Sequence, residues 1–216
     1  MEKKIAIIAG ASGLVGTQLL MQLLADSRYG KVIAVVRKKT AITNVKLEQL
    51  VIDFKLLPGA LKGLTADHGY CCLGTTLKTA GSKENQYVID HDYVVQFALG
   101  CVSAGVTRFA VVSSLGANAG SANFYLRTKG EMEQDLRNID FKALFILQPS
   151  ILMGDRKEVR TAEKAAISLM KMLNPLMVGG LSKYKGVQAD TVAACMVRNV
   201  NSEKGSVSII TSDNIH

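Results

Sequence analysis

A serine, a tyrosine and a lysine near the middle of the chain have the types and spacing needed to deliver a proton to a carbonyl oxygen. Ser114 follows an apolar run, and Tyr125 and Lys129 stand four residues apart, so they share one face of a predicted helix. A tyrosine hydroxyl has a pKa of about 10, too high for easy proton exchange at neutral pH, and a nearby lysine cation lowers it. The pattern predicts Tyr125 as the acid, Lys129 as its electrostatic partner, and Ser114, or less favourably Ser113, as the group that binds the substrate oxygen.

A tyrosine and a lysine at this spacing also occur by chance, so the interpretation depends on the elements around them. The alternative is that Tyr125 only covers a surface and that the two serines only end a strand. The start of the chain favours the chemical interpretation, because it predicts a nucleotide site. The apolar run Ile5–Ala9 leads into the turn 10–16, Gly-Ala-Ser-Gly-Leu-Val-Gly, and then into a helix-like segment, 17–24.

The order of strand, glycine turn and helix is typical of a site for a dinucleotide pyrophosphate. Glycine has no Cβ, so a phosphate can approach the backbone, and the helix N-terminus offers free N–H groups and the positive end of its dipole. The glycine spacing differs from the usual G-x-G-x-x-G pattern, which makes the motif weak alone. The uncharged stretch 5–25 also resembles a signal sequence or membrane anchor, but its early glycines and later polar residues favour a buried strand and an amphipathic helix.

A basic cluster follows the second predicted strand, 32–36. Arg37, Lys38 and Lys39 occupy the place where an acidic residue would bind the 2′-hydroxyl of an adenosine ribose. Three cations at this place suit a 2′-phosphate instead. The sequence therefore predicts NADP(H) as the cofactor rather than NAD(H).

Apolar runs alternate with helix-like segments along the rest of the chain, near 88–104 and 122–137. This alternation predicts an α/β fold, a doubly wound parallel sheet of the Rossmann type, within a single domain, 1–216. A short last strand is expected at 206–210 and a helix near 160–173. Because ligands bind at the carboxyl ends of such strands, we expect 150–216 to contribute the substrate wall.

Composition excludes several other classes of function. The net charge is +8, but basic and acidic residues are interspersed, which argues against nucleic acid as a partner. The four cysteines form no C-x-x-C pair and the three histidines have no ligand spacing, so no metal is expected. Free cysteines fit a reducing compartment, and we expect a cytoplasmic protein that is not embedded in a membrane.

Six motifs are spread along the chain: GASGLVG at 10–16, CCLGTT at 71–76, VIDHDYV at 88–94, VSSLGAN at 112–118, NFYLRTKGEME at 123–133 and QPSILMGDR at 148–156. Together they resemble the atypical short-chain dehydrogenases/reductases, and more closely the Tat-interacting protein family of oxidoreductase-like proteins. The resemblance covers essentially the whole chain. Two positions depart from the family: Gln148 stands where relatives often carry arginine, and Ser150 where they often carry glycine, so the resemblance is fuller on the cofactor side.

The resemblance implies a set of cofactor-binding residues. Tyr125 and Lys129 would also contact the cofactor, with Lys129 on the ribose. Arg37 and Lys38 would bind the 2′-phosphate, and Asp53 and Phe54 the adenine. The ribose and nicotinamide side would be lined by Leu73, Gly74 and Thr75, and the pyrophosphate turn by Gly10, Ser12, Gly13, Leu14 and Val15, with Gly16 closing it.

Two functions from different classes remain open. The first is an NADPH-dependent reductase of a small carbonyl or enone-like substrate, which the complete Ser, Tyr and Lys set favours. The second is a regulatory or sensor protein that binds NADPH and acts through protein partners without turnover, because a fold does not dictate a function. The sequence also leaves open a homodimer formed through the helices near 88–104 and 122–137.

Overall fold

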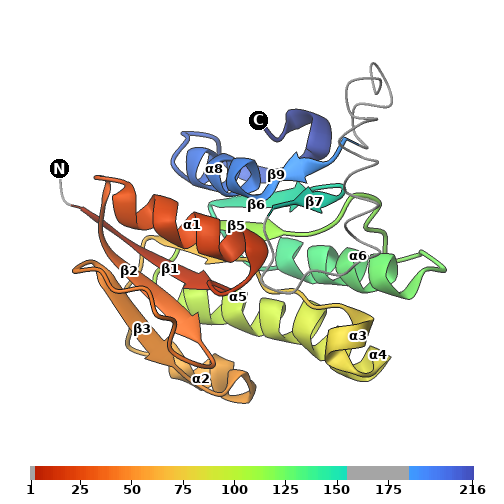
Figure 1. Ribbon diagram of the computed structural model, residues 1–216, viewed down its shortest axis with the longest axis horizontal. Coiled ribbons are helices and arrows are strands. Elements are labelled where there is room, and N and C mark those ends of the chain that lie inside the picture. The colour runs from red at the N-terminus through yellow and green to blue at the C-terminus, as the bar shows by residue number, and fades with distance from the viewer. Residues whose placement is uncertain (1–2, 155–184) are drawn as a thin grey trace.

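The computed structural model describes residues 3–154 and 185–216, and its centre is a sheet of seven parallel strands (Figure 1). The strand order is β3-β2-β1-β4-β5-β6-β9, so the chain reverses its direction of winding between β1 and β4. This order confirms the doubly wound Rossmann architecture. The strands are β1 (Lys4–Ala9), β2 (Tyr29–Val36), β3 (Leu47–Val51), β4 (His68–Cys71), β5 (Arg108–Val112), β6 (Ala143–Gln148) and β9 (Ser206–Thr211).

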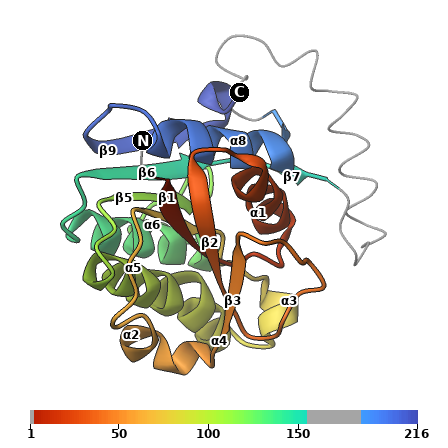
Figure 2. The same ribbon diagram turned by 90° about the vertical axis from the view of Figure 1, so that its left-hand side faces the viewer.

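Helices cover both faces of the sheet (Figures 1 and 2). Helices α1 (Leu14–Ala25) and α8 (Ala189–Val200) pack together on one face, while α2 (Leu57–Ala60), α5 (Tyr93–Ser103) and α6 (Phe124–Arg137) lie on the other. Alternate residues of each central strand enter the two cores, which is why β6 is buried along its whole length. Two short helices, α3 (Leu77–Ala80) and α4 (Lys83–Tyr87), and a π-helical turn (Val88–Asp92) lead into α5.

The element boundaries differ from the sequence predictions in three places. The apolar runs 50–52 and 70–73 of the sequence indicate β3 and β4, but both strands begin earlier, because each includes polar residues, such as Glu48 and His68, before its apolar run. Helix α8 was not predicted, although its buried side chains recur at helical spacing. The expected helix near 160–173 and part of the expected substrate wall lie outside the described residues. A small second sheet of β7 (Leu152–Met153) and β8 (Val187–Gln188) flanks that gap.

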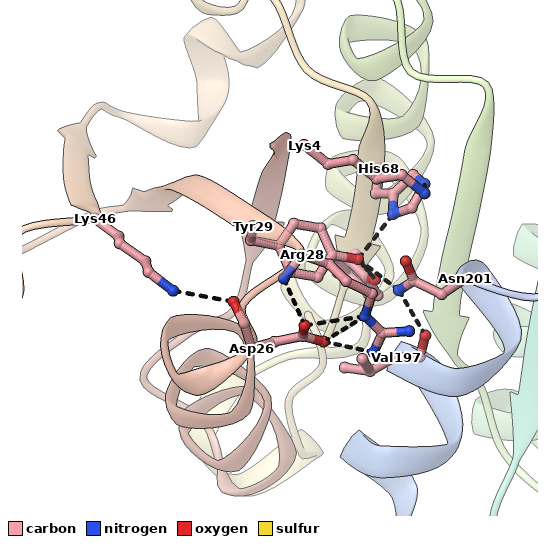
Figure 3. A network of polar contacts seen from close by, with 9 residues as sticks. Lys4, Asp26, Arg28, Tyr29, Lys46, His68, Val197 and Asn201 are labelled. Atoms are coloured by element: carbon pink, nitrogen blue, oxygen red, sulfur yellow. Dashed lines mark hydrogen bonds and ion pairs between the residues drawn. The ribbon is translucent and has the colours of Figure 1, made fainter. Parts of the chain in front are cut away.

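A network of polar side chains connects the amino ends of the strands (Figure 3). The Tyr29 hydroxyl lies 2.7 Å from the Tyr70 hydroxyl and 2.8 Å from His68 Nδ1, and it accepts a hydrogen bond from Asn201 Nδ2 at 2.8 Å. Burial, and then the charge of Lys4, lower the pKa of His68 to about 3, so the imidazole is neutral. Lys4 Nζ lies 3.3 Å from His68 Nε2 and can only donate, which leaves the ring hydrogen on Nδ1, facing Tyr29.

No helix in residues 3–154 and 185–216 is both long enough and apolar enough to cross a membrane. All four cysteines lie in this part of the chain as free thiols. Burial raises the pKa of Cys71 to about 12, so this thiol is not reactive.

Candidate active site

The glycines of the first turn have different surroundings. Gly10 follows β1 with φ +82°, and a Cβ there would lie 2.5 Å from the Cys72 carbonyl carbon. A Cβ on Gly16 would lie 2.0 Å from the Gly10 carbonyl oxygen, so both positions require glycine for packing within the protein. Gly13 is exposed, and its Cβ would meet only the Gly10 oxygen, at 3.4 Å. Of these three glycines, only Gly13 has open space on its solvent side, where a ligand would lie.

The N-terminus of α1 is open to an anion. Gly13 is the N-cap residue, none of the described side chains caps the helix, and its first turn carries no acidic residue. Of the predicted lining residues, Ser12 is exposed, Leu14 is half-buried and Val15 is buried. The free N–H groups and the dipole of α1 thus fit a pyrophosphate at this turn.

The residues predicted for the adenosine end lie just after β2 and β3. Arg37 and Lys38 are exposed, and neither belongs to an ion pair within the described part of the chain. Asp53 is exposed and accepts a hydrogen bond from the Lys55 N–H at 3.0 Å. The Phe54 ring is buried and packs edge-on against Tyr93, so this ring is not free to stack on an adenine.

The loop after β4 brings the expected ribose and nicotinamide residues beside a buried ion pair. The Thr75 N–H donates to Asp90 Oδ1 at 3.1 Å, and Lys129 Nζ lies 3.3 Å from the same oxygen. A Cβ on Gly74 would lie 3.2 Å from Asp90 Oδ1 and 3.8 Å from Lys129 Nζ. Leu73 is half-buried at the start of this loop. Residues 74–75 and Lys129 therefore meet at the carboxyl end of the sheet.

Helix α6 positions Tyr125 and Lys129. Asn123 caps the helix, its side chain accepting from the Leu126 N–H at 3.1 Å. Tyr125 is half-buried, whereas only 2% of Lys129 is exposed. Burial by itself would lower the pKa of Lys129, but the charge of Asp90 and then the Tyr125 phenol outweigh it and raise that pKa. The lysine is thus a buried ammonium close to the Tyr125 phenol.

The two serines after β5 have different partners. Ser113 is buried, and its hydroxyl donates to Glu133 Oε1 at 2.5 Å. Gln148 Nε2 donates to the same oxygen at 2.9 Å, and Arg137 lies 3.4 Å from the other carboxylate oxygen. Ser114 is half-buried, and within the described part of the chain its hydroxyl makes only a long contact of 3.4 Å to the Leu115 carbonyl. Ser114 therefore has the freer hydroxyl.

Sequence reasoning missed the two buried carboxylates of this site. Asp90 lies in the segment 88–94, which carried part of the family resemblance but was given no role. Glu133 follows Lys129 by four residues on α6, so it lies on the same helix face as Tyr125 and Lys129. That spacing was a usable signal for Glu133. The contact of Asp90 with Lys129 depends on the tertiary fold, so no local pattern predicts it.

Comparison with known proteins agrees with this geometry. Residues 10–203 match a family model described as NAD(P)H-binding. The chain is 33% identical over 206 residues to protein HTATIP2 of Rattus norvegicus, covering 93% of this chain and 82% of that protein. It is 32% identical over 184 residues to protein FMP52-1, mitochondrial, of Scheffersomyces stipitis, covering 84% and 77%.

Solved structures share the fold. The Bordetella bronchiseptica enzyme WbmH in complex with NAD+ has a TM-score of 0.71 at 16% identity, over 98% of this chain and 76% of that one. At 16% identity, this similarity is evidence for a shared fold only.

Proposed function

Because this chain belongs to the NAD(P)H-binding family, we propose that it is an NADPH-dependent oxidoreductase that reduces a small carbonyl or enone-like compound. The observation that carries the proposal is the buried ammonium of Lys129, which adjoins both Tyr125 and the loop at Gly74. A buried cation is costly unless it has a partner or a task, and perturbed groups of this kind concentrate at functional sites.

Each predicted group has a task in such a reduction. When bound, the nicotinamide supplies a hydride to the carbonyl carbon. Tyr125 gives its hydroxyl proton to the oxygen, and the Lys129 ammonium stabilises the phenolate that remains. The Ser114 hydroxyl donates a hydrogen bond to the same oxygen, for which its weak contact to Leu115 leaves it free. Ser113 and Glu133 hold the backbone that carries Ser114.

The preference for NADPH over NADH is part of the proposal. What supports this preference is that Arg37 and Lys38 are exposed just after β2, where the adenosine end of a dinucleotide would lie in a fold with this strand order. Both can form charge-assisted hydrogen bonds with a 2′-phosphate. The α1 N-terminus would hold the pyrophosphate between this end and Lys129.

We also propose that the protein acts in the cytoplasm on a small-molecule substrate, with a homodimer as its candidate assembly. The free thiols fit a reducing compartment, although the related fungal protein FMP52-1 is named as mitochondrial. Imaging of a fluorescent fusion distinguishes the two locations. Light scattering of the purified protein measures the oligomeric state.

The substitution Tyr125→Phe tests the reductase. It removes the hydroxyl that delivers the proton but keeps the ring and Lys129, so turnover should fall by about 100-fold or more while NADPH still binds. The measurement is NADPH oxidation by the parent and the variant over a panel of quinones, aldehydes and ketones, beside a binding titration. Undiminished turnover in the variant would remove Tyr125 from the mechanism. A parent that binds NADPH but oxidises it with no compound would favour the alternative, an NADPH-binding regulatory protein that acts through protein partners.

A further inference from the structure

Asp90 is a buried carboxylate to which the reaction above gives no task. It is 0% exposed and lies in the π-helical turn that precedes α5. Its Oδ1 contacts Lys129 Nζ at 3.3 Å and accepts from the Thr75 N–H at 3.1 Å, while its Oδ2 has no hydrogen-bond partner among the described residues. A carboxylate held this deeply, with one oxygen unused, is costly to maintain. π-Helical turns of this kind are frequent at functional sites.

The position of Asp90 changes what Lys129 does to Tyr125. An isolated ammonium near a phenol favours the phenolate. Here a carboxylate lies 3.3 Å from that ammonium, so its negative charge acts on the phenol with the opposite sign and offsets part of the effect of Lys129. The titratable groups that act on Lys129 come from three elements: Asp90 from the π-helical turn, Tyr125 from α6 and Cys71 from β4. Burial keeps the Cys71 thiol neutral, so Asp90 supplies the negative charge.

We propose that Asp90 holds the Lys129 ammonium in place and limits how strongly that charge favours the Tyr125 phenolate. Asp90 is thus a positioning residue that biases the site towards reduction. In that direction Tyr125 must carry its proton before the substrate oxygen can take it, whereas the reverse reaction requires the phenolate. This inference rests on the proposed function of Tyr125 as the acid.

The substitution Asp90→Asn tests the proposal in the cofactor-free protein. Asparagine keeps the shape and an oxygen for the Thr75 N–H but removes the charge, so the Lys129 ammonium acts on Tyr125 without offset. The titration of Tyr125 is isolated as the tyrosinate absorbance of each protein minus that of its Tyr125→Phe counterpart. We expect the midpoint to fall by about one unit or more. The matched control is Asp92→Asn, which removes a carboxylate from the same turn that is 38% exposed and paired with His91, and which should leave the midpoint unchanged.

Two outcomes would overturn the proposal. One is a midpoint that stays or rises in Asp90→Asn, and the other is loss of a proton by Lys129 without any tyrosinate. If Asp90→Asn does not fold, the double variant Asp90→Asn/Lys129→Met leaves no lone buried charge. Its midpoint should rise only slightly above that of the parent if Asp90 offsets part of the effect of Lys129, and a large rise would show that Lys129 acts without offset.

This experiment separates the inference from the proposed function, because it uses neither substrate nor turnover. A lowered midpoint together with full activity in Tyr125→Phe would keep the effect of Asp90 on the Tyr125 titration but remove Tyr125 from the mechanism. With a substrate, the alkaline fall of turnover in Asp90→Asn should move to lower pH by the same amount as the midpoint. If Asp90→Asn only disturbed the structure, turnover would fall but its dependence on pH would not shift.

Discussion

The two ends of the parallel sheet use polar side chains in different ways. At the amino ends, the buried Tyr29 hydroxyl is the centre of a network, with hydrogen bonds to His68, Tyr70 and Asn201 (Figure 3). At the carboxyl ends, exposed or half-buried polar groups such as Arg37 and Ser114 have few partners or only weak ones among the described residues. The amino end therefore satisfies most of its hydrogen bonds internally, although Asn201 Oδ1 has no partner among the described residues. The carboxyl end keeps polar groups available for a ligand, and this is the end at which α/β sheets bind their ligands.

The carboxyl end also has a buried layer of its own beneath the available groups. Glu133 bonds Ser113, and Asp90 pairs with Lys129, so Ser114 and Tyr125 each have a neighbour that is held in place. The buried pairs at the carboxyl end thus resemble the amino-end network. The two ends differ in their exposed and half-buried polar groups. A site orients a substrate when the side chains that bind it are held by fixed neighbours and still have free hydrogen-bonding groups.

The substitution Gly13→Val should have the largest effect, and that effect is on cofactor binding. It tests whether the carboxyl end of the sheet is the end that binds the cofactor. A Cβ at Gly13 would meet the Gly10 oxygen at an ordinary 3.4 Å, so the cofactor-free variant should remain folded. Its side chain would occupy the place of the pyrophosphate, and NADPH affinity should fall by about 100-fold or more. Thermal shift with and without NADPH measures both effects. A variant that NADPH stabilises as it stabilises the parent would exclude this site.

Gly16→Ala is the matched comparison in the same turn. Its Cβ would lie 2.0 Å from the Gly10 carbonyl oxygen, so the Tm of the cofactor-free protein should fall before any ligand is added. The two variants thus separate the glycine that faces the ligand from one that the fold itself requires.

The substitution Arg37→Ala sharpens the comparison by testing an exposed cation. Loss of a charge-assisted contact of about 1.5 to 3 kcal/mol corresponds to a loss of roughly ten- to a hundred-fold in NADPH affinity. NADH affinity should stay unchanged, because NADH has no 2′-phosphate. Lys31→Ala is the control, since Lys31 lies on β2, the strand that leads to Arg37, and is paired with Glu48. Equal affinity of the parent for both cofactors would show that Arg37 is only solvated surface.

Local pattern was sufficient for the sheet and for the glycine turn. The apolar runs predicted the strands because buried parallel strands are apolar on both faces, as β1 and β6 are. The turn at Gly10 was visible because strand, glycines and helix are adjacent in the chain. The same logic found Tyr125 and Lys129, which one helix holds together.

Contacts between distant segments could not be predicted in the same way. Asp90 reaches Lys129 only because the π-helical turn and α6 pack together, and Asn201 reaches Tyr29 from the end of α8. No helical or strand periodicity relates residues that are this far apart in the sequence. The burial of Phe54 also depends on α5, whose Tyr93 covers its ring.

The smallest expected effect concerns His68 at the amino end, and it concerns stability rather than binding. The pKa of His68 is about 3 in the folded protein and about 6.5 in the unfolded chain, so the unfolded state binds a proton first as the pH falls. Stability is therefore lost below about pH 6.5 and continues to fall towards about pH 3. Between about pH 7.5 and 5.5 this loss amounts to about 1.4 kcal/mol.

His68→Gln should remove this part of the pH dependence, whatever its effect on stability at neutral pH. Urea unfolding of the parent and the variant across that pH range measures it, with His216→Gln, at the exposed chain end, as the control that should behave as the parent does. NADPH affinity at neutral pH should be the same in all three proteins, because His68 lies at the end of β4 opposite to the cofactor turn. An identical pH slope in parent and His68→Gln would mean that the amino-end imidazole takes up a proton without loss of stability. A change in NADPH affinity would instead show that the two ends of the sheet are coupled, which the separate hydrogen-bond networks do not predict.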